Sequence, residues 1–221
     1  MILILSGGGK PEETKETDRY FVDLIPKNKK ILYIPIAKKT RPFEQCFQWL
    51  KSCLSFFGFS NIEMWTDLSE KNIGDLKKFS AIYIGGGNTF SLLDDLRNMD
   101  FLNVLKEFIE NDGIVYGSSA GAMILGKDIS TASYIDKNEV NLKNTAGINL
   151  LNDYSIYCHY QEKDDVLIKK LQQKKKLKIL ALPEGGGIVF KDGQMTNIGE
   201  QPLFVFEFNK AKRKIAPKEK I

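Results

Sequence analysis

Short apolar runs that alternate with segments of helical period constrain the fold of this chain most strongly. The runs are MILIL at the start, then ILYIPIA, IEMW, AIYIGG and GIVYG. They are apolar along their whole length, which is typical of strands buried on both faces of a parallel sheet. Between them, apolar residues at spacings of three and four predict two amphipathic helices, one with Phe43, Phe47, Leu50, Leu54 and Phe57 and one with Leu102, Leu105, Phe108 and Ile109. The pattern predicts an α/β fold with three layers, doubly wound around a mostly parallel, flavodoxin-like sheet.

The second half of the chain has a different pattern of apolar and polar segments. A polar stretch follows Leu125 and is succeeded by the strand YSIYCHY, a helix from about Lys163 to Leu171, and the strand KILAL. From Gly187 the runs IVFKDGQMTNI and PLFVFEF indicate two β segments, the first with an Asp-Gly turn. We therefore expect a small antiparallel annex at the C-terminal end. No repeat or low-complexity linker divides the chain, so residues 1–221 are expected to form a single domain.

Charge and hydropathy exclude several classes of partner. The net charge is +4, with much of the excess in Lys174–Lys176 and in the tail Lys210–Lys220. Because these runs lack interleaved aromatic residues, they indicate solvated surface and no nucleic-acid interface. The apolar runs are far shorter than the roughly 20 residues of a membrane span, and Met1 leads directly into a strand. We expect a cytoplasmic monomer or homodimer with no membrane partner.

Three glycine-rich loops follow predicted strands, and one of them contains a candidate nucleophile. The loops are SGGGK, GGGNTF and GSSAGA, and strand ends of this kind meet at the ligand-binding edge of an open α/β sheet. The segment Gly117–Gly121 matches G-x-S-x-G with Ser119 at its centre, an arrangement that exposes a serine on a sharp strand-to-helix turn. The N–H of Ala120 would then stabilise an oxyanion. The alternatives are a plain strand-to-helix turn or a phosphate cradle.

A serine nucleophile needs a base, and the chain has one histidine. His159 ends the strand YSIYCHY, on the edge predicted to carry the serine. For the acid, Glu184 in the strand-end loop LPEGGG is favoured by position over Asp136 in the polar stretch. Asp164 and Asp165 are predicted to begin a helix and cap it.

The loop GGGNTF supplies further candidates. Gly86 and Gly87 allow backbone N–H groups to approach a developing anion. Asn88 and Thr89 are predicted to cap the next helix, and substrate contact by either residue is compatible with that role.

Taken together, these motifs resemble the peptidase E, or aspartyl dipeptidase, family. The resemblance rests on YIGGGNTFSLL, GSSAGA, a histidine 40 residues after the serine and LPEGGG, in that order from Met1 through Gly187. It implies a class I glutamine amidotransferase-like fold, a small peptide substrate and no metal or other cofactor. By the same resemblance Ser119 is the nucleophile, His159 the base, and Ala120 with the Gly86–Gly87 loop the oxyanion hole.

The sequence departs from the family pattern in two places. Some members carry the triad aspartate roughly fifteen residues after the serine, where this chain has Thr131–Tyr134, so the resemblance favours Glu184 as the acid. Aspartyl dipeptidases also resemble one another in an arginine after the histidine, and residues 160–175 contain none. Lys163 or Lys169 would replace it as a point charge without the fork geometry. The resemblance therefore does not bring a preference for N-terminal aspartate to this chain.

The leading hypothesis from the sequence is a serine peptidase that hydrolyses dipeptides or small N-terminal acyl substrates. A catalytically silent relative that binds a small metabolite or partner is the alternative. An α/β-hydrolase esterase shares the order Ser119, Asp136, His159, but that fold usually places its histidine close to the C-terminus, and residues 160–221 follow it here. A glutamine amidotransferase would use cysteine in place of the elbow serine.

Overall fold

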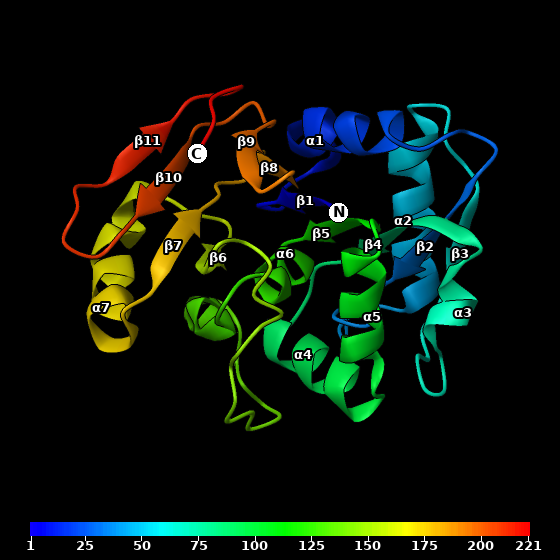
Figure 1. Ribbon diagram of the computed structural model, residues 1–221, viewed down its shortest axis with the longest axis horizontal. Coiled ribbons are helices and arrows are strands. Elements are labelled where there is room, and N and C mark those ends of the chain that lie inside the picture. The colour runs from blue at the N-terminus through cyan, green and yellow to red at the C-terminus, as the bar shows by residue number, and fades with distance from the viewer.

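The computed structural model describes residues 1–221 and is built around a seven-stranded sheet (Figure 1). Its strand order is β3-β2-β4-β5-β1-β8-β9. Every pairing from β3 to β1 is parallel, whereas β8 and β9 are antiparallel to their neighbours. The predicted mostly parallel sheet is therefore confirmed. Its strands are β1 (Ile2–Ser6), β2 (Lys30–Ile34), β3 (Ile62–Met64), β4 (Phe79–Ile84), β5 (Ile114–Ser118), β8 (Gly187–Lys191) and β9 (Gln194–Asn197).

Helices cover both faces of this sheet, which gives the three predicted layers. Successive residues of β2 alternate between two hydrophobic clusters: Ile31 faces the cluster that includes α1 and α2, and Leu32 faces the cluster of the opposite layer. Burial on both faces explains why the strands are apolar along their whole length. One layer holds α1 (Pro11–Asp23) and α2 (Phe43–Ser55), and the other holds α3 (Ile73–Leu76), α4 (Thr89–Asn98), α5 (Phe101–Glu110) and α6 (Ala120–Leu125).

A second, four-stranded sheet lies beside the first, at the left of Figure 1, with the order β11-β10-β7-β6. It pairs β6 with β7 in parallel and adds β10 and β11 in antiparallel fashion. The helix α7 (Asp165–Lys175) connects β6 to β7. The strands are β6 (Tyr154–Tyr157), β7 (Lys178–Ala181), β10 (Leu203–Phe206) and β11 (Arg213–Ile215).

The predicted C-terminal annex is only partly the second sheet. The hairpin that turns at Asp192–Gly193 extends the main sheet, because β8 pairs with the edge of β1 that β5 leaves free. The second sheet instead takes in β6 and β7, which correspond to the predicted strands YSIYCHY and KILAL ahead of the annex. Its edge strand β11 lies within the basic tail Lys210–Lys220, for which the sequence predicts solvated surface and no strand. Only Ile215 of β11 is buried, so the sequence of that strand carries no apolar pattern.

The remaining regular structure consists of two short 3-10 helices, η1 (Ile129–Tyr134) within the polar stretch and η2 (Glu162–Asp164) before α7. None of the helices combines the length and the apolar character needed to cross a membrane.

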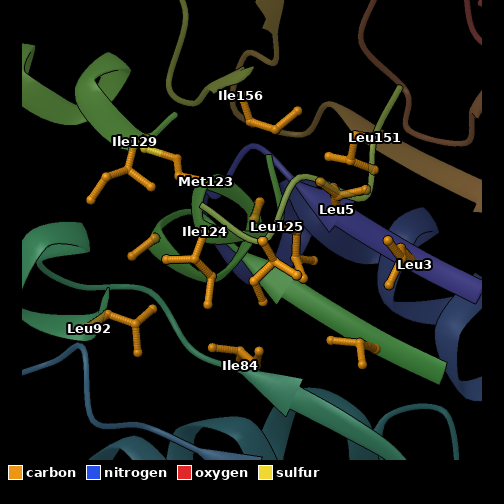
Figure 2. Packing of buried hydrophobic residues seen from close by; sticks show 14 of the residues in the cluster. Leu3, Leu5, Ile84, Leu92, Met123, Ile124, Leu125, Ile129, Leu151 and Ile156 are labelled. Carbon is orange, nitrogen blue, oxygen red and sulfur yellow. The ribbon is translucent and has the colours of Figure 1, made fainter. Parts of the chain in front are cut away.

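The helix α6, which follows the candidate nucleophile, is buried along its entire length. Figure 2 shows Met123, Ile124 and Leu125 among side chains from both β-sheets and from the neighbouring helix α4. A helix of this length is not stable by itself, so its position depends on these contacts. The packing partners in view are Leu3, Leu5, Ile84, Leu92, Ile129, Leu151 and Ile156.

Glu63 on β3 gives a pH-dependent contribution to stability. Its carboxylate accepts hydrogen bonds from Lys78 at 2.7 Å, Lys30 at 2.9 Å and the indole of Trp65 at 2.9 Å. The bond from Lys78 is the largest cause that lowers the pKa of Glu63 to about 2. Because the pKa is lowered on folding, this stabilisation is complete above the pKa of an unfolded glutamate and is lost as the pH falls through about 2.

We predict that Glu63→Gln lowers the free energy of unfolding by about 1 kcal/mol at neutral pH. The difference from the wild type should shrink as the pH falls from about 5 towards about 2.5. Urea denaturation across this pH series measures it, with Glu200→Gln, an exposed glutamate, as the matched control. A difference that stays constant across the series would contradict the assignment.

Candidate active site

Ser119 occupies a strained turn between β5 and α6. Its backbone has φ 50° and ψ −106°, outside the usual regions for a residue other than glycine. The strain is held by hydrogen bonds: the N–H of Ser119 donates to the carbonyl of Ser6 at 3.0 Å, and its own carbonyl accepts from Ala122 and Met123. This geometry places the side chain at the carboxyl edge of the sheet, as the G-x-S-x-G pattern predicts.

His159 lies directly beside this serine, although it comes from the second sheet. Its Nε2 is 2.9 Å from the Oγ of Ser119. The residue follows β6, has φ 54°, and donates its backbone N–H to the carbonyl of Gly7 at 3.2 Å. The hydroxyl of Tyr134 donates to the carbonyl of the preceding residue, Cys158. On the other side of the residue, the N–H of Tyr160 donates to the carbonyl of Leu182 at 3.1 Å, so the main chain is fixed both before and after the imidazole.

Glu184 completes a hydrogen-bonded chain of three side chains. Its Oε1 is 2.9 Å from Nδ1 of His159, and the carboxylate side chain is 52% exposed. With an ionised carboxylate as partner, Nδ1 holds the proton, and Nε2 is left to accept from the Ser119 hydroxyl. The structure thus brings together the three residues that the sequence favoured for nucleophile, base and acid.

The loop after β1 holds these segments against one another. Gly7 donates to the carbonyl of Gly186 at 2.9 Å, and the carbonyl of Gly8 accepts from Gly185 at 3.1 Å. Gly8 has φ +87°, and a Cβ there would lie 2.5 Å from Cε1 of His159. Only glycine fits at this position, because both the conformation and the space exclude a side chain.

Asp136, the other candidate acid, lines the same cavity but makes no hydrogen bond to His159. Its Oδ2 accepts from the N–H of Thr89 at 2.9 Å and from the hydroxyl of Thr89 at 2.7 Å, which caps α4. Asn88 accepts from Ser91 at 2.9 Å as the N-cap of the same helix. The predicted cap by Asn88 is therefore present, whereas the one by Thr89 is not: Thr89 is the first residue of α4 and donates to Asp136. Asn88 also lines the cavity beside the serine, whereas Thr89 is fully buried and does not.

Three backbone N–H groups near Ser119 have no acceptor within the protein and are therefore candidates for an oxyanion hole. A Cβ on Gly86 would lie 3.2 Å from the Cβ of Ser119, so this loop and the elbow are in close contact. Neither Gly86 nor Gly87 donates its N–H to another group of the protein. Ala120 is the first residue of α6, where the N–H has no intrahelical acceptor.

A cavity of about 560 Å³ opens at the candidate nucleophile. Its lining includes Ser118, Ser119 and His159, but Lys163 and Lys169 are not part of it. The loop Lys38–Arg41, which is not among the residues predicted from the sequence, also lines the cavity. That loop follows the run ILYIPIA, so the rule that ligands bind at strand ends would have identified it. No group of three or more histidine, cysteine, aspartate or glutamate side chains is arranged to hold a metal ion.

Buried hydroxyl and thiol groups near the site remain protonated. Burial raises the pKa of Tyr33 and of Tyr83, both of which line the cavity, well above the usual value for tyrosine. Burial likewise raises the pKa of the Cys158 thiol, which contacts the carbonyl of Ser119. A thiol that stays protonated is a poor nucleophile, so Cys158 does not compete with the serine.

The α/β fold places the serine elbow and His159 at a cavity, with Glu184 hydrogen-bonded to the far side of the imidazole, and this arrangement is typical of hydrolases. Residues 2–198 match the model of peptidase family S51. The chain belongs to this family, which supports a peptidase.

Curated relatives agree with this assignment. The chain is 24% identical to peptidase E of Haemophilus influenzae (strain PittGG) over 195 residues, which cover 83% of this chain and 80% of the relative. It is 24% identical to peptidase E of Actinobacillus pleuropneumoniae serotype 5b (strain L20) over 225 residues, 92% of each chain.

Solved structures show the same fold. A peptidase from an acI-B1 Actinobacterium superposes with a TM-score of 0.75 at 18% identity and covers 100% of this chain and 96% of that one. A candidate peptidase E protein of Listeria monocytogenes EGD-e superposes with a TM-score of 0.72 at 23% identity and covers 90% of this chain and 98% of that one.

The contact between Gly8 and the imidazole gives a prediction about the site. Gly8→Ala should displace His159 and slow the reaction of Ser119 with a fluorophosphonate by at least about tenfold, because the serine loses its hydrogen-bond acceptor. Labelling rates measure this effect.

The matched control is Gly193→Ala. Gly193 also has a positive φ, +75°, but a Cβ there meets nothing within 4 Å. Both variants should lose thermal stability from backbone strain, and only Gly8→Ala should lose labelling rate. Equal labelling by the two variants would show that the close approach of Gly8 does not position the histidine.

Proposed function

We propose that this protein is a serine peptidase that hydrolyses short peptides through an acyl-enzyme. The observation that carries the proposal is the chain of hydrogen bonds from Ser119 through His159 to Glu184, with two contacts of 2.9 Å, at the edge of a cavity. A nucleophile bonded to a base that is itself oriented by a third group is the arrangement that covalent catalysis requires.

In the acylation step, Oγ of Ser119 attacks the carbonyl carbon of the scissile peptide bond. Nε2 of His159 takes the serine proton, and the electron pair of the carbonyl moves onto oxygen. The N–H groups of Ala120 and of the Gly86–Gly87 loop stabilise this oxyanion. Nε2 then gives the proton to the leaving nitrogen, the carbon–nitrogen bond breaks, and the amine product departs.

In the deacylation step, water replaces the amine. Nε2 of His159 takes a proton from the water as its oxygen attacks the acyl carbon, and the oxyanion forms again at the same N–H groups. The carbon–Oγ bond breaks, Oγ recovers the proton from Nε2, and the acid product leaves. Glu184 stabilises the imidazolium in both steps without taking its proton.

The cavity volume supports a small substrate. About 560 Å³ lies within the range of cavities that bind small molecules. We therefore propose dipeptides and other short peptides as the substrate class. The candidate preference for N-terminal aspartate has no arginine after the histidine to support it.

Ser119→Ala should reduce peptide hydrolysis by at least about 1,000-fold, because it removes the nucleophile and leaves only binding and the oxyanion hole. Turnover of a dipeptide panel measures this loss. Ser118→Ala is the matched control. Ser118 lines the cavity without contacting the histidine and should retain most of the activity.

A fluorophosphonate should label Ser119 in the wild type, and mass spectrometry of the labelled peptide identifies the site. A wild type that hydrolyses no peptide of the panel and takes no label would contradict the proposal. Tight binding of small molecules without turnover, unchanged in Ser119→Ala, would instead support a catalytically silent protein.

The identity of the acid is tested by a pair of carboxylate variants. Glu184→Gln should lower kcat by about 100-fold, less than for a buried triad acid, because the carboxylate is half exposed and screened by solvent. Asp136→Ala should instead lower the free energy of unfolding by about 1 kcal/mol through loss of the α4 cap, with a smaller effect on kcat. The reverse pattern in kcat and thermal unfolding would assign the acid to Asp136.

A further inference from the structure

Two cations in the cavity have no ionic partner in the protein. Lys38 and Arg41 belong to the loop after β2, and both line the cavity that contains Ser119. The neighbouring Lys39 is paired with Asp95 at 2.5 Å and is therefore already neutralised. No carboxylate of the protein lies within salt-bridge distance of Lys38 or Arg41.

Contacts of the main chain fix this loop close to the nucleophile. The carbonyl of Ala37 accepts from the N–H of Asn88 at 2.8 Å. Gly87, with φ +152°, packs so tightly on the loop that a Cβ would lie 2.1 Å from the carbonyl oxygen of Ala37 and 2.7 Å from the N of Lys38. Because the adjacent Gly86 touches Ser119, one glycine loop lies between the cations and the nucleophile.

The cavity also contains anionic groups, and they restrict where an acidic ligand group binds. Glu139 and Asp136 line the cavity, and Asp136 is held by Thr89 at the start of α4. A ligand carboxylate beside Glu139 would be repelled, whereas the same group beside Lys38 and Arg41 would be attracted. The charges of the cleft therefore favour one position for a carboxylate.

We propose that Arg41 and Lys38 bind a carboxylate of the peptide substrate and thereby determine its specificity. The guanidinium of Arg41 forms two parallel N–H bonds to a carboxylate, and Lys38 adds a point charge. The inference rests on the proposed peptidase function and names the substrate class: short peptides that carry a C-terminal carboxylate or an acidic side chain near the scissile bond. In this proposal the arginine that binds the carboxylate belongs to the loop after β2. An arginine in residues 160–175, where this chain has none, is therefore not required.

Binding to the Ser119→Ala protein tests the inference without turnover. Calorimetry compares three probes: Ala-Ala with its terminal carboxylate, Asp-Ala amide with a side-chain carboxylate, and Ala-Ala amide with neither. At least one of the first two should bind about tenfold more tightly than Ala-Ala amide, as expected for a charge-assisted bidentate contact. The tighter of the two identifies which carboxylate is recognised.

Adding Arg41→Gln should remove most of this preference, and Arg41→Lys should restore only part of it, because lysine retains the charge without the fork. Arg213→Gln is the matched control, since Arg213 is an exposed arginine on β11 outside the cavity. It should leave the preference unchanged. Thermal unfolding confirms that each variant is folded.

Equal affinity for all three probes, no measurable binding of any, or a preference that survives both Arg41→Gln and Lys38→Gln would overturn the inference. The proposed function is tested separately by turnover in the wild type. If the wild type hydrolyses peptides but shows no preference for a carboxylate, the proposed function stands and the inference about Arg41 and Lys38 is wrong. If the protein prefers carboxylate probes but hydrolyses no peptide, the carboxylate site stands and the proposed function is wrong.

Discussion

The site depends on the main-chain hydrogen bonds made by the end of β1 and the glycine loop that follows it. Ser6 accepts from Ser119, Gly7 accepts from His159, and the Gly7–Gly8 segment exchanges bonds with Gly185 and Gly186 beside Glu184. The nucleophile comes from the main sheet, whereas the base follows a strand of the second sheet and the acid lies between the two sheets. One loop therefore fixes the relative positions of all three side chains. Backbone hydrogen bonds position them more precisely than contacts between flexible side chains would.

Solvent exposure increases along the chain of hydrogen bonds from Ser119 through His159 to Glu184. Ser119 is 9% exposed, the His159 side chain 30% and the Glu184 side chain 52%. Electrostatic interactions weaken in contact with water, so solvent screens the contact between His159 and Glu184 more than the one between Ser119 and His159. An acid near solvent orients the histidine at a smaller cost of desolvation than a fully buried carboxylate would incur. The strain at Ser119 is held by the buried helix α6 and does not depend on the acid.

Much of the fold could be predicted from the sequence, because strands buried on both faces consist of continuous apolar runs. The same reasoning explains which strands could not be predicted. The edge strand β11 buries only Ile215 and has no apolar run. The separation of β6 and β7 into a second sheet arises from pairing with β10, which no local pattern encodes. The candidate triad could be predicted because its members follow strands and carry recognisable motifs. The loop with Lys38 and Arg41 also follows a strand, but it has no motif, and a basic loop has the same composition whether it lines a cavity or faces bulk solvent.

A crystal structure of the protein inactivated with a fluorophosphonate tests the central claim most directly. The account predicts phosphorus bonded to Oγ of Ser119, with the phosphoryl oxygen about 2.7–3.1 Å from the N–H of Ala120 and from an N–H of the Gly86–Gly87 loop. Nε2 of His159 should remain beside the adduct, with Nδ1 bonded to Glu184. An adduct on another residue, or a phosphoryl oxygen directed to solvent with the histidine separated from Glu184, would contradict it.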